Sequence, residues 1–334
     1  TKQNNFPFDI QINNKEEVLK AAILKSDFNR KYASFHMDAM DRLEKNSNPF
    51  FALPLRGIGI ATAYNVSDFY GATTFTYDPK IEVTMTSKDE VIIHAIKPSE
   101  VIQDIWKETA AEILQIDKAG IKIDSDFSID ELPSSPEDTF SSIGAMNELI
   151  KRACNDIQKK RFHQGLPITS KKSLTSTAKK NWNKEDFSGT PFSNPAFATC
   201  VVELELDTYT YSEKIKGIWL TVDCGEVFDE NAATKTLRLE IQQELSMLVE
   251  GRSIPCDKLD ISFIKSKNKP GQMSSLVHNT LPAAFSSALS LALTTQVPQL
   301  PCTEDRLYDL LKERETEIQQ EVTIKDNTAD EESK

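Results

Sequence analysis

Side chains that could transfer protons gather in few places in this sequence, and the clearest is the segment around His278. His278 follows a Pro-Gly turn at 270–271 and precedes an apolar helical pattern over 281–293, where Pro282 suits a first helical turn. Histidine titrates near neutral pH and can act as a general base. Its neighbour Val277 cannot accept a proton, and the rest of this loop offers serines. The sequence therefore places one titratable side chain ahead of a helix N-terminus, a position that suits an acid or an anion.

Polar residues also stand at the start of two further predicted helices, which span 100–116 and 141–160. Asp104 falls near the first turn of the first helix, where the helix dipole favours acids for structural reasons alone. Ser141 and Ser142 begin the second helix, and serine is an ordinary cap there. Each of these groups has a structural explanation beside any role in binding a ligand.

The cysteines of this chain do not have the spacing of a metal site. There are five, they are far apart, and they form no CxxC pair, so we expect no zinc site, iron–sulfur cluster or disulfide framework. Separated thiols are typical of a reducing cytoplasm, where they serve as small buried hydrophobes. The five are Cys154, Cys200, Cys224, Cys256 and Cys302.

Charge and hydropathy exclude two classes of partner. With 39 basic against 51 acidic residues the formal net charge is −12, which disfavours nucleic acid and anionic membrane surfaces. No uninterrupted apolar run reaches the roughly 18 residues of a membrane span. We therefore expect a cytoplasmic protein with no nucleic-acid or membrane partner. Because the chain begins at Thr1 rather than Met, we interpret it as a processed protein or a fragment.

Hydrophobic periodicity predicts the same order of elements twice. Each half reads as strand, strand, helix, strand, helix, with long helices that carry one apolar face. The predicted fold class is therefore α+β, with duplicated ββαβα units and helices packed on one face of each sheet. The first half has strands at 80–86, 89–96 and 120–127 between the two helices given above; the second has strands at 199–207, 214–223 and 258–264 and helices at 233–249 and 281–293.

Composition divides the chain into five predicted segments. The N-terminal segment reads as amphipathic helices, and the first unit opens with a Gly-interrupted strand at 56–64. A connection rich in Ser, Thr and Lys separates the two units, and the C-terminal tail is acidic and predicted to be disordered. The segments are a helical lead-in at 1–50, the first unit at 51–162, the linker at 163–195, the second unit at 196–312 and the tail at 313–334.

Four stretches, in order, carry a resemblance to a known family: EEVLKAAILKSDFNRKYASF, LRGIGIATAY, NPAFATCVVELELDTYTYSEKIKGIWLTVDCGEVFDEN and LPCTEDRLYDLL. Together they resemble the C-terminal half of the molybdenum-binding subunit of xanthine dehydrogenase and aldehyde oxidase. The resemblance covers most of the chain. It implies a molybdenum centre held by a pterin, hydroxylation of purines or aldehydes, and partner domains that carry flavin and iron–sulfur clusters.

The resemblance also implies that the active-site positions are altered. In the family, a Gly-x-Gly-Glu-Pro loop supplies the glutamate that acts as general base. Counting along the loop from Gly271 places Val277 at that glutamate and His278 at the following proline, so His278 is a possible substitute base. We therefore expect a catalytically degenerate chain and assign no catalytic residue.

The implied pterin contacts are weak for the same reason. The family's phosphate-binding Gly-Gln-Gly falls on Ser99, Glu100 and Val101, and Asp104 stands where threonine is usual, so that carboxylates would repel a phosphate. Near the family's other cofactor contacts, Asp223 and Gly225 remain, but such a pair serves a turn as readily as a ligand. The closest counterparts of an Asn-Pro and a later glutamine are Asp229, Glu230 and Thr236. The weak cofactor-binding candidates are Ser99, Ser141, Ser142 and Thr236.

Three functions stay open at this point. The chain is a degenerate, non-catalytic half of a molybdenum-hydroxylase subunit, or a working half completed by a partner chain, or a scaffold or ligand-binding protein on the same fold. Its expected partners are the N-terminal half of the molybdenum domain with FAD and iron–sulfur subunits, or further copies of itself.

Overall fold

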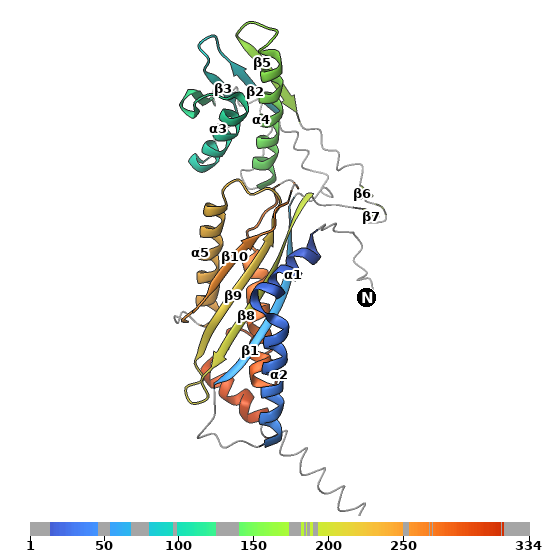
Figure 1. Cartoon of the computed structure of the whole chain (residues 1–334), viewed down its shortest axis with the longest axis vertical. Coiled ribbons are helices and arrows are strands. Elements are labelled where there is room, and N and C mark those ends of the chain that lie inside the picture. The colour runs from blue at the N-terminus through green and yellow to red at the C-terminus, as the bar shows by residue number, and fades with distance from the viewer. Residues whose placement is uncertain are drawn as a thin grey trace, which may run out of the picture. The chain divides into compact units, whose positions relative to one another are not determined.

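The computed structural model of the chain describes residues 14–45, 54–67, 80–95, 99–124, 140–173, 182–183, 185, 188–189, 193–249, 254–266, 268, 270–314 and 316. Helices and strands alternate in two compact units, which confirms the predicted α+β class (Figure 1). The first unit includes Val66–Pro195, and the second includes Ile12–Asn65, Ala196–Lys267 and Met273–Lys334.

The first unit is a four-stranded sheet in the order β4-β3-β2-β5 with two helices against it. Alternate residues of the strands are buried, as the period of two predicted, and they form one core with the helices. The Trp106 ring and the apolar stripe of α4 fill that core. The elements are β2 (Lys80–Met85), β3 (Val91–His94), α3 (Glu100–Leu114), a 3-10 turn (Lys118–Gly120), β4 (Ile121–Asp124), α4 (Phe140–Lys160) and β5 (Ile168–Ser173).

Strand β5 corrects the expectation that 163–195 is a linker throughout. It pairs antiparallel with β2 along its whole length, so part of the polar segment belongs to the sheet. Polar composition concealed the strand because its inward positions include Ser170, whose hydroxyl donates to Asp156 of α4 at 2.7 Å. Lys160 and Lys172 pair with the same carboxylate at 3.0 and 3.3 Å. Later in the segment, β6 (Trp182–Asn183) and β7 (Ser188–Gly189) form a short antiparallel pair.

The second unit is a four-stranded sheet in the order β1-β8-β9-β10. One set of alternating side chains from β8 and β9 packs with α5 and α6 in the largest core of the molecule. The opposite face packs against α1 and α2 through a smaller cluster that includes Val201 and Trp219. The elements are α1 (Lys15–Ser26), α2 (Phe28–Lys45), β1 (Leu55–Ser67), β8 (Ser193–Leu206), β9 (Glu213–Asp223), α5 (Glu230–Leu248), β10 (Leu259–Phe263) and α6 (Leu276–Leu293).

The Gly-interrupted strand forms, but it belongs to the other unit. β1 pairs with β8 in the second sheet, whereas the sequence predicted that it would open the first unit. Its glycines have a steric reason: a Cβ atom on Gly57 would lie 1.9 Å from the carbonyl oxygen of Ala288, and one on Gly59 would lie 2.1 Å from that of Ala284. Only a residue without a side chain lets β1 lie directly on the backbone of α6.

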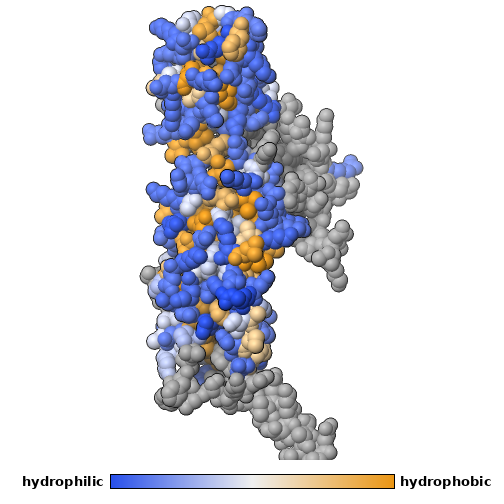
Figure 2. Space-filling view, in the orientation of Figure 1, coloured by the Kyte–Doolittle hydropathy of each residue, from blue (hydrophilic) through white to orange (hydrophobic). Residues whose placement is uncertain are grey.

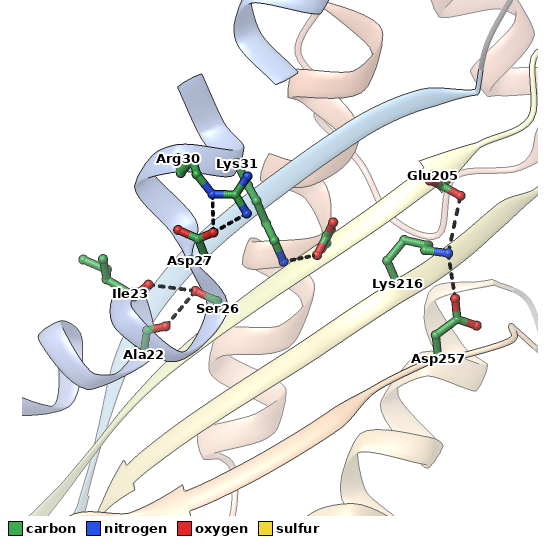
Figure 3. A network of polar contacts seen from close by, with 10 residues as sticks. Ala22, Ile23, Ser26, Asp27, Arg30, Lys31, Glu205, Lys216 and Asp257 are labelled. Carbon is green, nitrogen blue, oxygen red and sulfur yellow. Dashed lines mark hydrogen bonds and ion pairs between the residues drawn. The ribbon is translucent and has the colours of Figure 1, made fainter. Parts of the chain in front are cut away.

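The predicted N-terminal helices are α1 and α2, and a sharp turn at Asp27 joins them. Asp27 has a left-handed backbone with φ of 55°, and the Ser26 hydroxyl donates to the Ala22 carbonyl at 2.7 Å (Figure 3). Arg30 pairs with the Asp27 carboxylate across the turn. Lys31 then bonds Glu203 of β8 at 2.6 Å, which ties the start of α2 to the sheet.

Residues 304–314 after α6 are helical, and most of the predicted acidic tail at 313–334 lies outside the described residues. Among the described helices, α6 alone is long and apolar enough to match a membrane span. Its buried positions belong to the largest core.

Candidate functional site

The start of α6 holds the two residues that the sequence singled out first. The helix begins at Leu276, so Val277 and His278 lie in its first turn, and the prediction of a loop up to about 281 was wrong. The cause is a turn at Ser275, whose φ of 71° reverses the chain and whose carbonyl accepts the first helical bond from Asn279 at 2.9 Å. Pro282 therefore lies inside the helix rather than at its start.

Val277 points into the core. It is 2% exposed and belongs to the large apolar cluster of the second unit with Leu281 and Phe285. A side chain at this position contacts hydrocarbon, so the environment favours valine and disfavours any charged group.

His278 faces away from that core and meets a partner that the sequence reading missed. Its Nδ1 lies 3.0 Å from Oε2 of Glu244 on α5. The histidine side chain is 70% exposed, whereas that of Glu244 is 8% exposed. Glu244 could have been found from the sequence, because it falls on the inward stripe of its helix between Ile241 and Leu248, where an acid needs a partner.

The His278–Glu244 pair is able to accept a proton. A carboxylate that holds one ring nitrogen fixes the orientation of the imidazole. The other ring nitrogen takes no part in this contact, and the side chain that carries it is exposed. The pair is thus the one acid–base arrangement that the described residues build near the predicted base position.

The N-terminus of α3 holds the predicted phosphate-contact residues in a different setting. Ser99 occupies the cap position, but its side chain makes no capping bond, and its carbonyl accepts from Gln103 at 3.0 Å. Val101 is 70% exposed. Asp104 forms an ion pair with Lys118 at 3.4 Å. These residues form a solvated helix start with acidic side chains.

The other candidates divide between the units. Ser141 and Ser142 lie in the first turn of α4 in the first unit, and their side chains are outside the described part of the structure. Thr236 lies on the exposed side of α5 in the second unit, where its hydroxyl donates to the Ala232 carbonyl at 3.1 Å. The described contact of Thr236 is a local helix bond, which needs no ligand.

The acids around the end of β9 have structural roles. Asp223 accepts from the Gly225 amide at 3.0 Å and from the Asn14 side chain at 3.0 Å, so it holds the turn and the start of α1. Asp229 caps α5 by accepting from the Ala232 amide at 2.9 Å. Both are explained by the backbone they support.

Within the described residues, no group of three or more His, Cys, Asp or Glu side chains could hold a metal ion. Burial raises the pKa of the Cys154 and Cys200 thiols to about 12, and burial together with the neighbouring Asp223 carboxylate raises that of Cys224 to about 11. These thiols are therefore protonated at neutral pH and behave as packing groups.

Comparison with known proteins finds a family model that matches part of the chain. Residues 95–235 match the model of the molybdopterin cofactor-binding domain. Within these bounds the chain is similar to molybdopterin cofactor-binding domains. The match confirms the resemblance to molybdenum-binding subunits that the sequence motifs indicated. No curated protein matches the chain.

Solved structures share the fold of this chain at low sequence identity. The aldehyde oxidoreductase of Desulfovibrio gigas is 17% identical with a TM-score of 0.59, and covers 86% of this chain and 35% of its own. Carbon monoxide dehydrogenase of Oligotropha carboxidovorans is 12% identical with a TM-score of 0.67, at 92% and 47% coverage. Quinoline 2-oxidoreductase of Pseudomonas putida 86 is 12% identical with a TM-score of 0.63, at 90% and 46% coverage. This chain therefore spans between a third and a half of the length of these proteins.

Proposed function

We propose that this chain is a non-catalytic part of a molybdenum-hydroxylase-like assembly, which keeps the cofactor-binding fold and serves as a scaffold. The observation that carries the proposal is the burial of Val277, at the position where the family resemblance puts the general base. A hydrocarbon side chain cannot take the proton of a hydroxyl nucleophile. The proposal goes beyond the match to molybdopterin-binding domains, because it adds that the chain has lost catalytic activity.

The start of α3 supports the proposal independently. A pterin phosphate needs backbone amides that it can approach closely and positive charge nearby. Here Glu100 stands in the first turn and Asp104 follows, while the neighbouring cation Lys118 is already paired with Asp104. On the described residues the α3 N-terminus does not fit a phosphate, so we assign no step of a reaction to a bound cofactor.

A second candidate function is an active half-subunit that uses His278 as the base and is completed by a partner chain. The contact with Glu244 at 3.0 Å favours it, because an oriented histidine next to the expected base position could accept a proton. In this alternative the cofactor contacts come mostly from the partner.

The expected assembly follows from the length of the relatives. Because the chain spans 35 to 47% of the matched proteins, we propose that the rest of a molybdenum subunit, with flavin and iron–sulfur subunits, completes it in the cytoplasm. A homo-oligomer is the competing arrangement.

Molybdenum content decides between the two functions. The protein should be isolated from its own host with its natural partners, and assayed for molybdenum by mass spectrometry and for oxidised pterin by fluorescence. We expect neither above background. Molybdenum near one atom per chain would contradict the scaffold proposal. In that case, hydroxylation of an aldehyde or a purine should be compared between the wild type and His278→Gln, and a shifted pH profile in the variant would assign the base to His278.

A further inference from the structure

One exposed side of α2 lacks the charged residues that a solvated helix face usually carries. Surface helices turn charged and polar side chains toward water. From Tyr32 to Met40, however, a side of α2 that covers roughly 140° of the helix circumference carries uncharged side chains alone. All of them are exposed, and Tyr32, Met37 and Met40 are 43, 67 and 42% exposed. These side chains form the α2 stripe: Tyr32, Ala33, His36, Met37 and Met40.

The α2 stripe is separate from the side of the helix that packs on its own unit. That inner side is formed by Phe35 and Ala39, which are 5 and 1% exposed. Tyr32 of the stripe stacks on Phe28 and on His36, with 5.6 and 6.0 Å between ring centroids, so three rings form one row along the helix. Figure 2 shows hydrophobic surface over α1 and α2 among the hydrophilic atoms of this unit. Exposed aromatic and methionine side chains without charged neighbours are typical of the centre of a protein interface.

Two charged residues of opposite sign stand at one border of the α2 stripe. Arg30 and Asp41 are both exposed and lie about three helical turns apart, which places them within about 20° of each other around the helix and about 16 Å apart along its axis. They are too far apart to pair within one chain, and Arg30 pairs with Asp27 at the turn before α2. The midpoint between Arg30 and Asp41 falls between residues 35 and 36, and the midpoint of the stripe falls at residue 36. The stripe and its border charges therefore share one centre.

We propose that the α2 stripe binds the α2 stripe of a second copy of this chain, with the two helices antiparallel. A two-fold symmetric interface requires a patch that is complementary to itself. Reversing the helix about the shared centre places Arg30 of each copy opposite Asp41 of the other and lays uncharged side chains against uncharged ones. A parallel arrangement would place like charges together. Charge complementarity therefore selects both the occupant and its direction.

The existing contact of Arg30 does not oppose this pairing. Its ion pair with Asp27 is between exposed side chains, and such surface pairs contribute little and exchange readily. Two copies joined through α2 keep the rest of their surface for other subunits. The inference therefore goes beyond the proposed function and does not depend on it.

Sedimentation velocity of the full chain over a wide range of concentrations tests the pairing. We expect an equilibrium between monomer and dimer. Arg30→Asp and Asp41→Arg should each raise the dissociation constant at least tenfold, because either change removes both symmetric ion pairs and brings like charges together. The combined variant should return to the wild-type value, since the reversed charges face one another again. A role of either residue within its own chain predicts no such rescue.

Asp38→Arg is the matched control, because it makes the same change of charge as Asp41→Arg. Asp38 is exposed and lies roughly on the far side of α2 from the centre of the stripe, so its reversal should leave the dissociation constant unchanged. Ala33→Lys, at an exposed position within the stripe, should abolish the dimer and keep the circular dichroism spectrum of the wild type. A chain that stays monomeric at every concentration would refute the proposal, and so would a dimer that survives Ala33→Lys or that the combined variant fails to restore.

Photo-cross-linking identifies the occupant of the stripe in the natural assembly. Benzoylphenylalanine in place of Tyr32 should link to the segment around Met40 of a second copy and give a product of twice the mass of the chain. Links to a different polypeptide in its place would show another occupant and contradict the proposal. Molybdenum measured on the same sample reports on the scaffold proposal separately, because the pairing of α2 involves no cofactor.

Discussion

The contact between β1 and α6 makes a direct prediction: Gly57→Ala destabilises the second unit. A Cβ atom at this position would meet the Ala288 carbonyl oxygen at 1.9 Å and its carbon at 2.8 Å, whereas real Cβ contacts stay above 3.0 Å. Both atoms are helix backbone, so the strand and the helix must separate by about 1 Å, which loosens the core around them. We expect a loss of about 3 kcal/mol in the free energy of unfolding, since overpacking against rigid atoms lies at the upper end of its range.

Urea denaturation followed by the fluorescence of Trp219 measures this loss. Trp219 is buried in one cluster with Ile58, the neighbour of Gly57, so it reports the unit in question. Trp106 and Trp182 should be replaced by phenylalanine to remove their signals. Gly120→Ala, followed by the fluorescence of Trp106 in a variant that keeps this residue, is the control in the first unit, because a Cβ atom there meets nothing within 4 Å. A loss below about 1 kcal/mol for Gly57→Ala, with an unchanged denaturant slope, would refute the steric explanation of the glycine.

Three further predictions address the other contacts. The Ser170 hydroxyl, with Lys160 and Lys172, holds the pKa of Asp156 well below its usual range, so its stabilisation is fully present at neutral pH and declines as the pH falls from about 4 toward that lowered pKa. Asp156→Asn should therefore cost about 1 kcal/mol at pH 7 in urea titrations, and the cost should shrink progressively below about pH 4. A double-mutant cycle of Glu244→Gln and His278→Gln should give a coupling of about 0.5 to 1 kcal/mol, and additive effects would show that the contact contributes nothing. Iodoacetamide should label Cys256, the exposed thiol, in the folded protein and the four buried cysteines only after unfolding, which mass spectrometry of tryptic peptides resolves.

Much of the fold could be predicted because its signals are local. The apolar stripes of α3 and α5 and the alternation in β8 and β9 appear within single windows of sequence, and the structure has each of these elements at close to the predicted bounds. The repeated order of elements then follows without knowledge of distant contacts. The family resemblance relied on the same local stretches and is confirmed over 95–235.

The features that could not be predicted depend on partners far away in the sequence. β1 precedes the first unit along the chain, yet it pairs with β8, more than a hundred residues later. The start of α6 depends on the left-handed turn at Ser275, which sequence rules assign to glycine or asparagine. Glu244 can be singled out from the sequence as an acid on an inward helix stripe, but its partner His278 cannot, because that residue lies on another helix. Strand β5 is polar because its inward Ser170 bonds α4 rather than filling an apolar core.

The two positions where the sequence departs from the family's expected pattern have one property in common, which bears on the scaffold proposal. Burying the Val277 side chain stabilises the second unit by about 1.5 kcal/mol, while an ionised glutamate in the same surroundings would cost several kcal/mol. At the start of α3, Glu100 complements the helix dipole, and Asp104 pairs with Lys118. In each case the residue present stabilises its own unit. Catalytic groups commonly cost stability, so a chain released from catalysis is expected to exchange them for residues of this kind.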